Sequence, residues 1–331
     1  MRVLVVKLSS LGDVIQTLPV LHDIYQHFPQ ARIDWVVEEA FADLLRTVPS
    51  IERVLPIAQR RWRKRPFSTD SRQGWNAFWQ NLHQVDYDLV IDFQGLIKSA
   101  WVARGARLAP KGASVTYGNA SDLCGYEWPV RWMLTHSVAM EKTIHAVARY
   151  RSLAARACGH SAADWLAHAP TYPWLVQAAH QPPVVVFAHG TTRPDNEWVF
   201  EHWRALGQRF IADGFQVVVP QASEAEHTWA TQLATQLGEA CQVWPKMMLA
   251  AVQSEMAHAS LVVGVDSGLS HLAVALNLPV VQLFSQPRVA RAGPVGLAHQ
   301  QAVGGSHVPT VDEVWAMQTQ VMAAAPARPH A

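Results

Sequence analysis

Residues 264–271, with the sequence GVDSGLSH, combine small side chains with one carboxylate, Asp266, and one imidazole, His271. They follow the apolar run 261–263 and lead into an apolar helical pattern, which predicts a buried parallel strand that turns into a helix. Such a turn presents free backbone N–H groups at the positive end of a helix dipole, and both attract phosphate. An ordinary turn capped by Asp266 or Ser267 accounts for the same residues. The stretch is therefore either a phosphate-binding turn or a capped turn without a ligand.

A second carboxylate, Asp13, lies shortly after the strand predicted at residues 2–6. It falls in the first turn of the next helical pattern, at the carboxyl end of a strand, where open α/β sheets bind their ligands. The position suits an N-cap, which these residues alone favour, and it also suits a catalytic carboxylate. Because Pro19 lies inside the same helical pattern, we expect a kink or an early end of that helix.

A third candidate is the loop at residues 189–198, which follows the apolar run 184–187. It offers the hydroxyls of Thr191 and Thr192, a glycine and the guanidinium of Arg193 at the carboxyl end of a strand. A phosphate or nucleotide cradle needs donors of this kind. Turn chemistry alone would also explain the Gly, Pro and Asp residues of the loop.

Residues 60–65, with the sequence RRWRKR, carry five positive charges in six positions and are expected in a loop before the next helix. A solvated loop is the simple interpretation of such a run. The nearby rings of Trp62, Pro66 and Phe67 favour a second interpretation, a membrane-docking segment, because cations interleaved with amphipathic rings suit an anionic membrane interface. At about 1 kcal/mol per basic residue, the stretch would contribute about 5 kcal/mol at most, which is enough for reversible docking.

Short apolar runs alternate with helical patterns along the chain, which predicts βαβ units and parallel sheets. The strands predicted in the first half are 2–6, 33–37, 54–57 and 89–93, with helices at 41–46, 120–134 and 141–158. Those predicted in the second half are 184–187, 216–219, 241–243, 261–265 and 280–284. The Ala-, His- and Pro-rich residues 160–183 are the expected linker. We therefore expect two doubly wound domains, 1–172 and 173–331, that face a central cleft.

The composition excludes several classes of protein. The 331 residues suffice for two domains with their own cores, and a net charge of +1 gives no global attraction to nucleic acid. The three cysteines are far apart, so neither a disulfide framework nor a thiolate zinc site is expected, and a reducing cytoplasm fits. No apolar run approaches the roughly 18 residues of a membrane-spanning helix.

Several familiar motifs are absent from the sequence. It contains no G-x-x-x-x-G-K-[ST] loop, no G-x-G-x-x-G after the first predicted strand and no H-E-x-x-H. The 16 histidines are scattered without metal-ligand spacing. Tryptophans at positions 75, 79, 101, 132, 203 and 229 fall on helical patterns, which favours positions in the core.

Taken together, these segments resemble the family 9 glycosyltransferases, the lipopolysaccharide heptosyltransferases. The likeness runs from residue 1 to about residue 321 and rests on segments 7–14, 34–39, 60–64, 92–99, 191–193, 245–247 and 266–271. The Asp-x-Gly-Leu-Ser-His segment is shared across that family. The basic stretch and the Gln-Gly-Leu-x-Lys-Ser segment are typical of the members that add the first heptose.

The resemblance implies a GT-B fold with two Rossmann-like domains, of which the first binds the acceptor and the second binds the nucleotide sugar. It implies transfer of heptose from ADP-L-glycero-β-D-manno-heptose to the Kdo of Kdo2-lipid A, with inversion and without a metal or other cofactor. It also implies a peripheral position on the cytoplasmic, anionic face of the inner membrane and no nucleic-acid partner.

The resemblance assigns roles by position as well. Asp13 would be the general base on the acceptor hydroxyl. The donor would meet Thr191, Thr192, Arg193, Asn196, Glu226, Met247, Asp266, Ser267, Gly268 and His271. The acceptor would meet Ser10, Gly12, Arg60, Arg61, Arg63, Lys64, Gln94 and Lys98. The charged groups of the acceptor that meet the basic residues would be lipid A phosphates or Kdo carboxylates.

One departure from the family pattern concerns Asn196, where relatives commonly have a Lys that meets the donor phosphates. An Asn brings no positive charge, so Arg193 and the backbone donors at Ser267 and Gly268 are the expected substitutes. Three alternatives stay open from the sequence: a second-heptose transferase, another ADP-sugar enzyme of the same fold, and a non-catalytic two-domain nucleotide-sugar binding protein.

Overall fold

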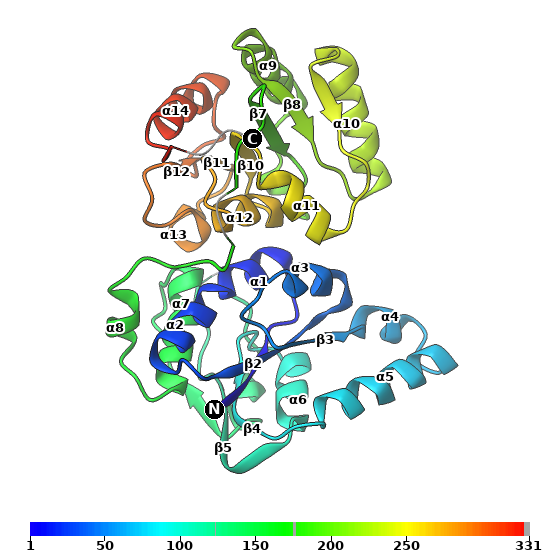
Figure 1. The fold of residues 1–331 in the computed structure, drawn as a ribbon, viewed down its shortest axis with the longest axis vertical. Helices are drawn as coiled ribbons and strands as arrows, with labels where there is room; N and C mark the ends of the chain where they lie inside the picture. Colours follow the sequence, from blue (N-terminus) through cyan, green and yellow to red (C-terminus); the bar gives the residue numbers. More distant parts are fainter. Residues whose placement is uncertain (123, 175–176, 328–331) are drawn as a thin grey trace. The chain divides into compact units, whose positions relative to one another are not determined.

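The computed structural model describes residues 1–122, 124–174 and 177–327. The chain divides into two compact units, Met1–Pro173 and Trp174–Ala331, called here the N-terminal and C-terminal units. Each unit is built on a six-stranded parallel sheet with helices on both faces (Figure 1). The predicted fold class, two doubly wound α/β domains, is therefore confirmed. The sequence put the boundary between them after residue 172.

The sheet of the N-terminal unit has the order β3-β2-β1-β4-β5-β6, and its strand pairs are all parallel. This is the strand order of dinucleotide-binding Rossmann sheets, with the switch point between β1 and β4. The strands are β1 Arg2–Val6, β2 Arg32–Glu38, β3 Arg53–Ile57, β4 Tyr87–Asp92, β5 Leu108–Tyr117 and β6 His136–Val138. The sequence did not predict β5 and β6.

The helices of the N-terminal unit differ from prediction in several places. Residues 59–64 form a helix, not a loop, because Trp62 is buried on one side while Arg and Lys, which are good helix formers, remain exposed on the other. The helix expected at 120–134 is wrong, since only η2 forms there, and α7 begins later than expected. The helices are α1 Leu11–Thr17, α2 Pro19–His27, η1 Glu39–Phe41, α3 Ala42–Arg46, α4 Gln59–Lys64, α5 Thr69–Leu82, α6 Ile97–Gly105, η2 Trp128–Trp132, α7 Ala146–Ala157 and α8 Ala162–Leu166.

Pro19 acts as predicted. The first helix ends at Thr17, and Pro19 takes the first position of α2, where its missing N–H costs no hydrogen bond. The expected linker at 160–183 is only partly correct, because α8 lies inside it and packs on α7. Residues 175 and 176, also within that range, lie outside the described residues.

Aromatic side chains join α4, α5 and α6. Trp75 stacks on Trp101 with ring centroids 5.0 Å apart, and Trp62 and Trp79 meet this pair edge-on. We call these four residues the tryptophan cluster. Two predicted core positions are wrong, since Trp101 is 42% exposed and Trp132 is 59% exposed.

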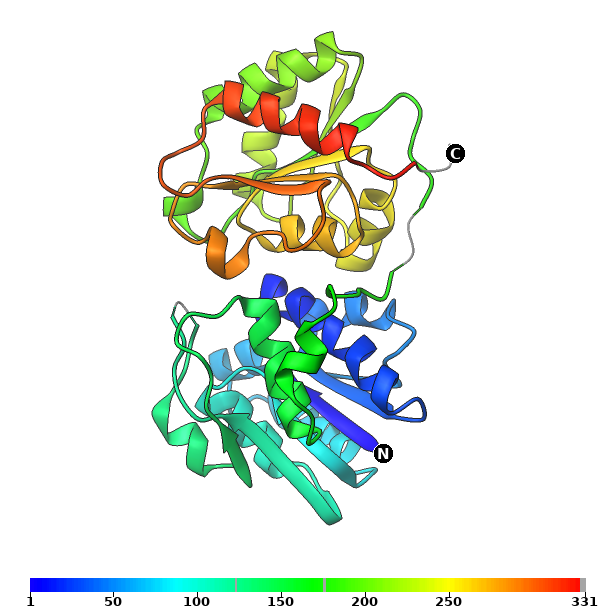
Figure 2. The same cartoon turned by 90° about the vertical axis from the view of Figure 1, so that its left-hand side faces the viewer.

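The C-terminal unit repeats the plan with the order β12-β11-β10-β7-β8-β9. Helices α9, α10 and α14 lie on one face of its sheet, and α11 and α12 lie on the other (Figures 1 and 2). Its elements are β7 Val184–Ala188, η3 Pro194–Asn196, α9 Phe200–Ala212, β8 Gln216–Val219, α10 Glu224–Leu237, β9 Cys241–Val243, α11 Leu249–Met256, β10 Leu261–Val265, α12 Gly268–Ala275, β11 Val280–Phe284, α13 Val289–Ala292, β12 Gln300–Gly304 and α14 Val311–Ala323. The sequence did not predict β12.

Alternate residues of the strands of the C-terminal unit pack with α9, α10 and α14 into one apolar core. The core thus fixes the carboxyl ends of β7, β8, β10 and β11 along one edge of the sheet, because neighbouring strands are parallel and in register. Among the helices of the described chain, none has both the length and the apolar character needed to cross a membrane.

Candidate functional site

Asp13 lies at the third position of α1, immediately beyond the carboxyl end of β1. The N-cap is Ser10, whose backbone N–H and hydroxyl both donate to Asp13 Oδ2, at 3.1 and 2.9 Å. The other carboxylate oxygen, Oδ1, accepts from the hydroxyl of Tyr150 on α7 at 2.8 Å. The expectation that Asp13 is itself the N-cap is wrong, but its place in the first turn is correct. Its side chain is 25% exposed, so a ligand can reach it.

Lys7 lies behind this carboxylate. Its buried ammonium donates to the Tyr150 hydroxyl at 3.1 Å and to the Phe93 carbonyl at 3.2 Å, and its Nζ lies 4.0 Å from Asp13 Oδ1. Burial lowers the pKa of Lys7, and the charge of Asp13 opposes that change. Burial, followed by the charge of Asp13, raises the pKa of Tyr150 well above its usual value. The Tyr150 hydroxyl therefore stays protonated and serves as a donor to Asp13.

The loop after β4 supports the same corner of the sheet. Gln94 Oε1 accepts from the backbone N–H groups of Leu8 and Ser9 at 3.1 and 3.2 Å, which fixes the chain just before Ser10. Asp92 accepts from the Gln94 N–H at 3.0 Å and is fully buried. In this structure Gln94 thus positions the turn that carries Asp13, beside its predicted role toward the acceptor.

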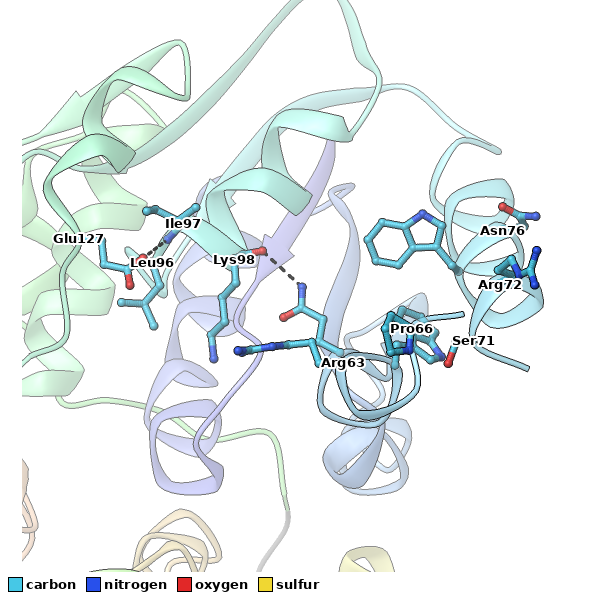
Figure 3. Close-up of a pocket in the computed structure, with 12 residues that line it drawn as sticks. Arg63, Pro66, Ser71, Arg72, Asn76, Leu96, Ile97, Lys98 and Glu127 are labelled. Carbon is cyan, nitrogen blue, oxygen red and sulfur yellow. Dashed lines mark hydrogen bonds between the residues drawn. The ribbon is translucent and has the colours of Figure 1, made fainter. Parts of the chain in front are cut away.

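A pocket of about 880 Å³ lies between α4, α5 and the start of α6 (Figure 3). Arg63 and Lys98 extend into it from opposite sides, and Glu127 adds one carboxylate. Gln59 Nε2 donates to the Lys98 carbonyl at 3.4 Å and links α4 to α6. Its wall also contains Trp62, Pro66, Ser71, Arg72, Trp75, Asn76, Leu96 and Ile97. Three cations, Arg63, Arg72 and Lys98, beside indole rings can hold an anionic group attached to an apolar one.

The four basic residues predicted on this stretch are not equivalent. Arg63 lines the pocket, whereas Arg61 is held by Glu39, at 3.1 Å, and by Asp70. The backbone N–H of Arg60 donates to Glu38, and the side chains of Arg60 and Lys64 are exposed. The charge of Arg61 is thus largely balanced within the protein, which leaves Arg63 as the member most directly available to a ligand.

In the C-terminal unit, a smaller pocket of about 300 Å³ lies between the loop after β7 and the start of α10. Two predicted donor residues, Thr191 and Glu226, meet there. Gly190 permits this approach, because a Cβ at that position would lie 2.9 Å from Glu226 Oε1. His189 and Trp229 also line this pocket and stack with ring centroids 3.9 Å apart.

Burial lowers the pKa of His189 to about 4, so this imidazole is neutral near pH 7. A neutral ring stacked on an indole offers a flat, uncharged wall to a heterocycle. The helical pattern around Trp229 favoured a position in the core, and no sequence motif singled out His189. The only indication in the sequence that His189 could line a ligand pocket was its position directly after a predicted strand.

Asp266 leaves β10 as predicted, and Ser267 is the N-cap of α12. Asp266 Oδ1 lies 3.4 Å from His271 Nε2, and Asn196 Nδ2 lies 3.4 Å from Asp266 Oδ2. Burial alone would raise the pKa of Asp266, but the hydrogen bond and charge of His271, with Arg291 and Arg288, lower it overall. Asp266 therefore stays ionised. If this turn binds a phosphate, cations nearby must offset the repulsion between the phosphate and this carboxylate.

The remaining predicted donor residues lie along the same edge of the sheet. Gly268 opens α12, and Arg193 and Thr192 lie in the loop after β7. Met247 lies in the loop after the edge strand β9. Asn196 is buried, with only 1% of its surface exposed. Sequence reasoning missed Arg288, which follows β11, although loops after neighbouring parallel strands must meet at one edge.

Within the described parts of the chain, no three His, Cys, Asp or Glu side chains gather in a way that could hold a metal ion. Asp86 and Asp88, at the start of β4, both have partners within the protein. Asp86 pairs with Arg107 at 2.9 Å, and Asp88 accepts from the Arg2 backbone N–H at 2.7 Å.

Comparison with known proteins gives three consistent findings. The sequence model of glycosyltransferase family 9 (heptosyltransferase) matches residues 75–319. A protein of Pseudomonas aeruginosa named lipopolysaccharide heptosyltransferase 1 is 40% identical over 301 residues, which cover 89% of this chain and 82% of that protein.

Two solved structures are similar over nearly the whole chain. The structure of E. coli heptosyltransferase WaaC with ADP has a TM-score of 0.80 and 34% identity, and the match covers 98% of this chain and 100% of that one. The structure of WaaC with ADP-2-deoxy-2-fluoro heptose has a TM-score of 0.77 and 35% identity, with 96% and 98% covered. The chain is thus similar in sequence and fold to proteins studied with an ADP-sugar analogue.

Proposed function

The chain belongs to glycosyltransferase family 9, the heptosyltransferases, and from this membership we propose that it transfers L-glycero-D-manno-heptose from ADP-heptose to the Kdo of Kdo2-lipid A in lipopolysaccharide inner-core biosynthesis. The observation that carries the proposal is the near full-length similarity to WaaC, whose structure with ADP-2-deoxy-2-fluoro heptose is 35% identical in sequence. The enzyme is accordingly a glycosyltransferase.

The donor nucleotide is proposed to bind the C-terminal unit. The pocket at Thr191 and Glu226 would hold the nucleoside against the stacked rings of His189 and Trp229. The diphosphate would lie along the sheet edge toward the Ser267 turn, where backbone N–H groups open α12. Thr192, Met247, Gly268 and His271 would complete this site.

In the N-terminal unit, Asp13 is proposed as the general base. The acceptor hydroxyl oxygen attacks the anomeric carbon as the bond to the ADP oxygen breaks. The proton passes to Asp13, and ADP leaves with the electron pair of the broken bond. Attack opposite the leaving group inverts the anomeric centre. Ser10 and Tyr150 support this role, because they hold both carboxylate oxygens in place.

The acceptor's anionic groups are proposed to bind the cations around the larger pocket. Arg63 and Lys98 face the same space, and Arg60 and Lys64 add exposed charge beside it. Such a cationic rim with indole rings also suits peripheral attachment to the cytoplasmic, anionic face of the inner membrane.

The test is ADP release by the purified chain given ADP-heptose and Kdo2-lipid A in excess EDTA. We expect release by the wild type and a fall of at least a hundredfold in Asp13→Ala, about 3 kcal/mol of transition-state stabilisation. Asp43→Ala on α3 is the matched control and should keep activity. Turnover by Asp13→Ala at the wild-type rate would exclude Asp13 as the base, and activity that disappears with EDTA would exclude metal-independent transfer.

Two rivals give different results in the same assay. A non-catalytic binding protein would bind ADP-heptose without releasing ADP. A second-heptose transferase would release ADP only with an acceptor that already carries one heptose. The mass of the glycolipid product distinguishes the last case directly.

A further inference from the structure

The proposed diphosphate site contains an uncharged, buried side chain, Asn196, next to the carboxylate of Asp266. Asn196 brings no positive charge, and its amide is directed to Asp266, with Nδ2 3.4 Å from Oδ2. Since phosphate oxygens carry full negative charge, a site without a compensating cation would bind them weakly. The positive charge must therefore come from another element.

Arg288 is placed to supply it. It is the N-cap of α13, in the loop after β11, and only 9% of its surface is exposed. Its guanidinium has no hydrogen bond to any residue in the described part of the chain. The nearest carboxylate is that of Asp195, with Arg288 Nη2 3.7 Å from Asp195 Oδ2, which is beyond hydrogen-bond distance. The nitrogens of this guanidinium are not sealed from solvent, so an anion can reach them and form the hydrogen bonds that the protein does not supply.

The charges around Arg288 are not balanced within the protein. Asp195 is shared, because Arg193 Nε also lies 3.7 Å from its Oδ1. Asp266, the other carboxylate nearby, is already engaged by His271 and Asn196. Burial and the charge of Arg193 lower the pKa of Arg288, and Arg291 on α13 contributes to that effect. Arg193 and Arg288 thus share one carboxylate, Asp195, while Asp266 is engaged by other residues.

The sheet topology brings this group to the expected place. Strands β7, β10 and β11 are neighbours in the order β11-β10-β7, and each runs in the same direction. The loops that carry Arg193, Asp266 and Arg288 therefore leave adjacent strand ends. Gln286 Nε2 donates to the Asp195 carbonyl at 3.5 Å, and Ser285 Oγ to the Glu197 carbonyl at 3.4 Å, so the loop after β11 is tied to the loop after β7.

We propose that Arg288 binds the diphosphate of the nucleotide sugar and neutralises the departing ADP. The inference rests on the proposed function and adds to it the residue that completes the donor site. Arg193 acts beside Arg288 from the neighbouring loop. A planar guanidinium can contact two phosphate oxygens at once, which a lysine ammonium cannot do with the same geometry.

Calorimetric binding of ADP and of adenosine to the full chain tests the proposal. We expect Arg288→Ala to weaken ADP binding by about tenfold or more at low ionic strength, and to leave adenosine binding within about twofold of wild type. Arg288→Lys, which retains the charge, should keep most of the ADP affinity. Arg209→Ala is the matched control, since Arg209 pairs with Asp312 at 2.7 Å outside this group, and it should change neither affinity.

A second arm of the experiment places a positive charge on the neighbouring loop, at position 196. Asn196→Lys in the Arg288→Ala background should restore most of the lost ADP affinity, because a cation again reaches the same sheet edge. Thermal unfolding of each variant accompanies the titrations, and the comparison of adenosine with ADP separates lost charge from a damaged fold.

Three results would overturn the inference. ADP binding by Arg288→Ala equal to that of wild type would remove Arg288 from the site. An equal loss of adenosine and ADP affinity would mean that Arg288 only supports the fold. Wild-type protein that binds neither ADP nor ADP-heptose would overturn the proposed function and this inference with it. If the wild type binds both, a negative result in the Arg288 variants contradicts only the role of Arg288 and not the proposed function.

Discussion

At the scale of single residues, the orientation of Asp13 depends on a side chain far away in sequence. Ser10 is three positions away and holds Oδ2, but Tyr150, on α7, holds Oδ1. Only the fold brings Tyr150 to this position. The sequence could therefore indicate the carboxylate and its place after a strand, but not the hydroxyl that fixes it.

Replacing Tyr150 with Phe removes one hydrogen bond from Asp13 and keeps the ring. Such a bond to a charged group is worth about 1.5–3 kcal/mol, so we expect kcat to fall by roughly ten- to a hundredfold. The KM for ADP-heptose should stay within about twofold of wild type, because the proposed donor site lies in the other unit. Steady-state kinetics with both substrates measures this separation.

Tyr25→Phe is the control for that variant, since the Tyr25 hydroxyl donates to the Ser50 carbonyl at 3.0 Å and has no contact with Asp13. It should leave kcat unchanged. A Tyr150→Phe enzyme with the kcat of wild type would mean that Ser10 alone orients the carboxylate.

At the scale of elements, the proposed donor site depends on how closely α12 approaches the sheet. Gly264 lies in β10 between β7 and the first turn of α12, and Ser270 donates to the Val265 carbonyl at 2.6 Å across this contact. A Cβ on Gly264 would lie 2.7 Å from the Cβ of Ala188 and would overlap the Ser270 hydroxyl. The glycine thus sets the position of the N–H groups at the start of α12.

Gly264→Ala is expected to destabilise the C-terminal unit by about 1–3 kcal/mol, because the added methyl group overpacks the contact between strand and helix. This cost exceeds the stabilisation that alanine gives by reducing the entropy of the unfolded chain. It should also weaken ADP binding, since the turn must move outward. Thermal unfolding and ADP titration measure the two effects. Gly125→Ala, whose Cβ would have only an ordinary contact at 3.6 Å, should change neither. Unchanged ADP affinity in Gly264→Ala would show that the turn adapts.

The elements that the sequence predicted well are those with continuous apolar runs, because strands buried on both faces of a parallel sheet need them. It missed β5, whose sequence LAPKGASVTY includes Pro, Lys and Gly, and whose register shifts along β4. It missed β12 because this strand lies at the edge of the sheet and pairs on one side only, so it does not need a continuous apolar run. In the segment 120–134, where the predicted helix is wrong, Trp128 and Trp132 form an exposed pair of rings 5.0 Å apart on the short η2.

At the scale of the whole molecule, charge acts through its distribution and not through its sum. The net charge is only +1. The cations of α4 are nevertheless concentrated beside a pocket, and Arg61 is withdrawn from them by Glu39 and Asp70. The sequence showed the concentration, but the partners of Arg61 and the helical conformation of the stretch required the fold.

We therefore expect the chain to bind vesicles that contain anionic lipid and to be released by salt. Replacing Arg63 and Lys64 with Ala should weaken vesicle binding by roughly 30-fold, at about 1 kcal/mol for each charge. The control is the double variant Arg204→Ala with Arg209→Ala, whose two positions lie on α9. This variant lowers the net charge by the same amount and should bind vesicles as the wild type does. Co-sedimentation measures both. Equal losses in the two double variants would mean that net charge alone governs attachment.

The tryptophan cluster has a spectroscopic consequence. Trp75 and Trp101 stack at 5.0 Å across the contact between α5 and α6, and Trp79 meets both rings edge-on. Indoles this close share their excited states, so the native chain should give an exciton couplet in its circular dichroism that depends on the packing of these two helices. Trp101→Phe should weaken the couplet, because it removes the stacked pair and leaves the edge-on contacts of Trp75 with Trp62 and Trp79. The wall of the larger pocket can thus be followed optically during lipid binding, without an attached label.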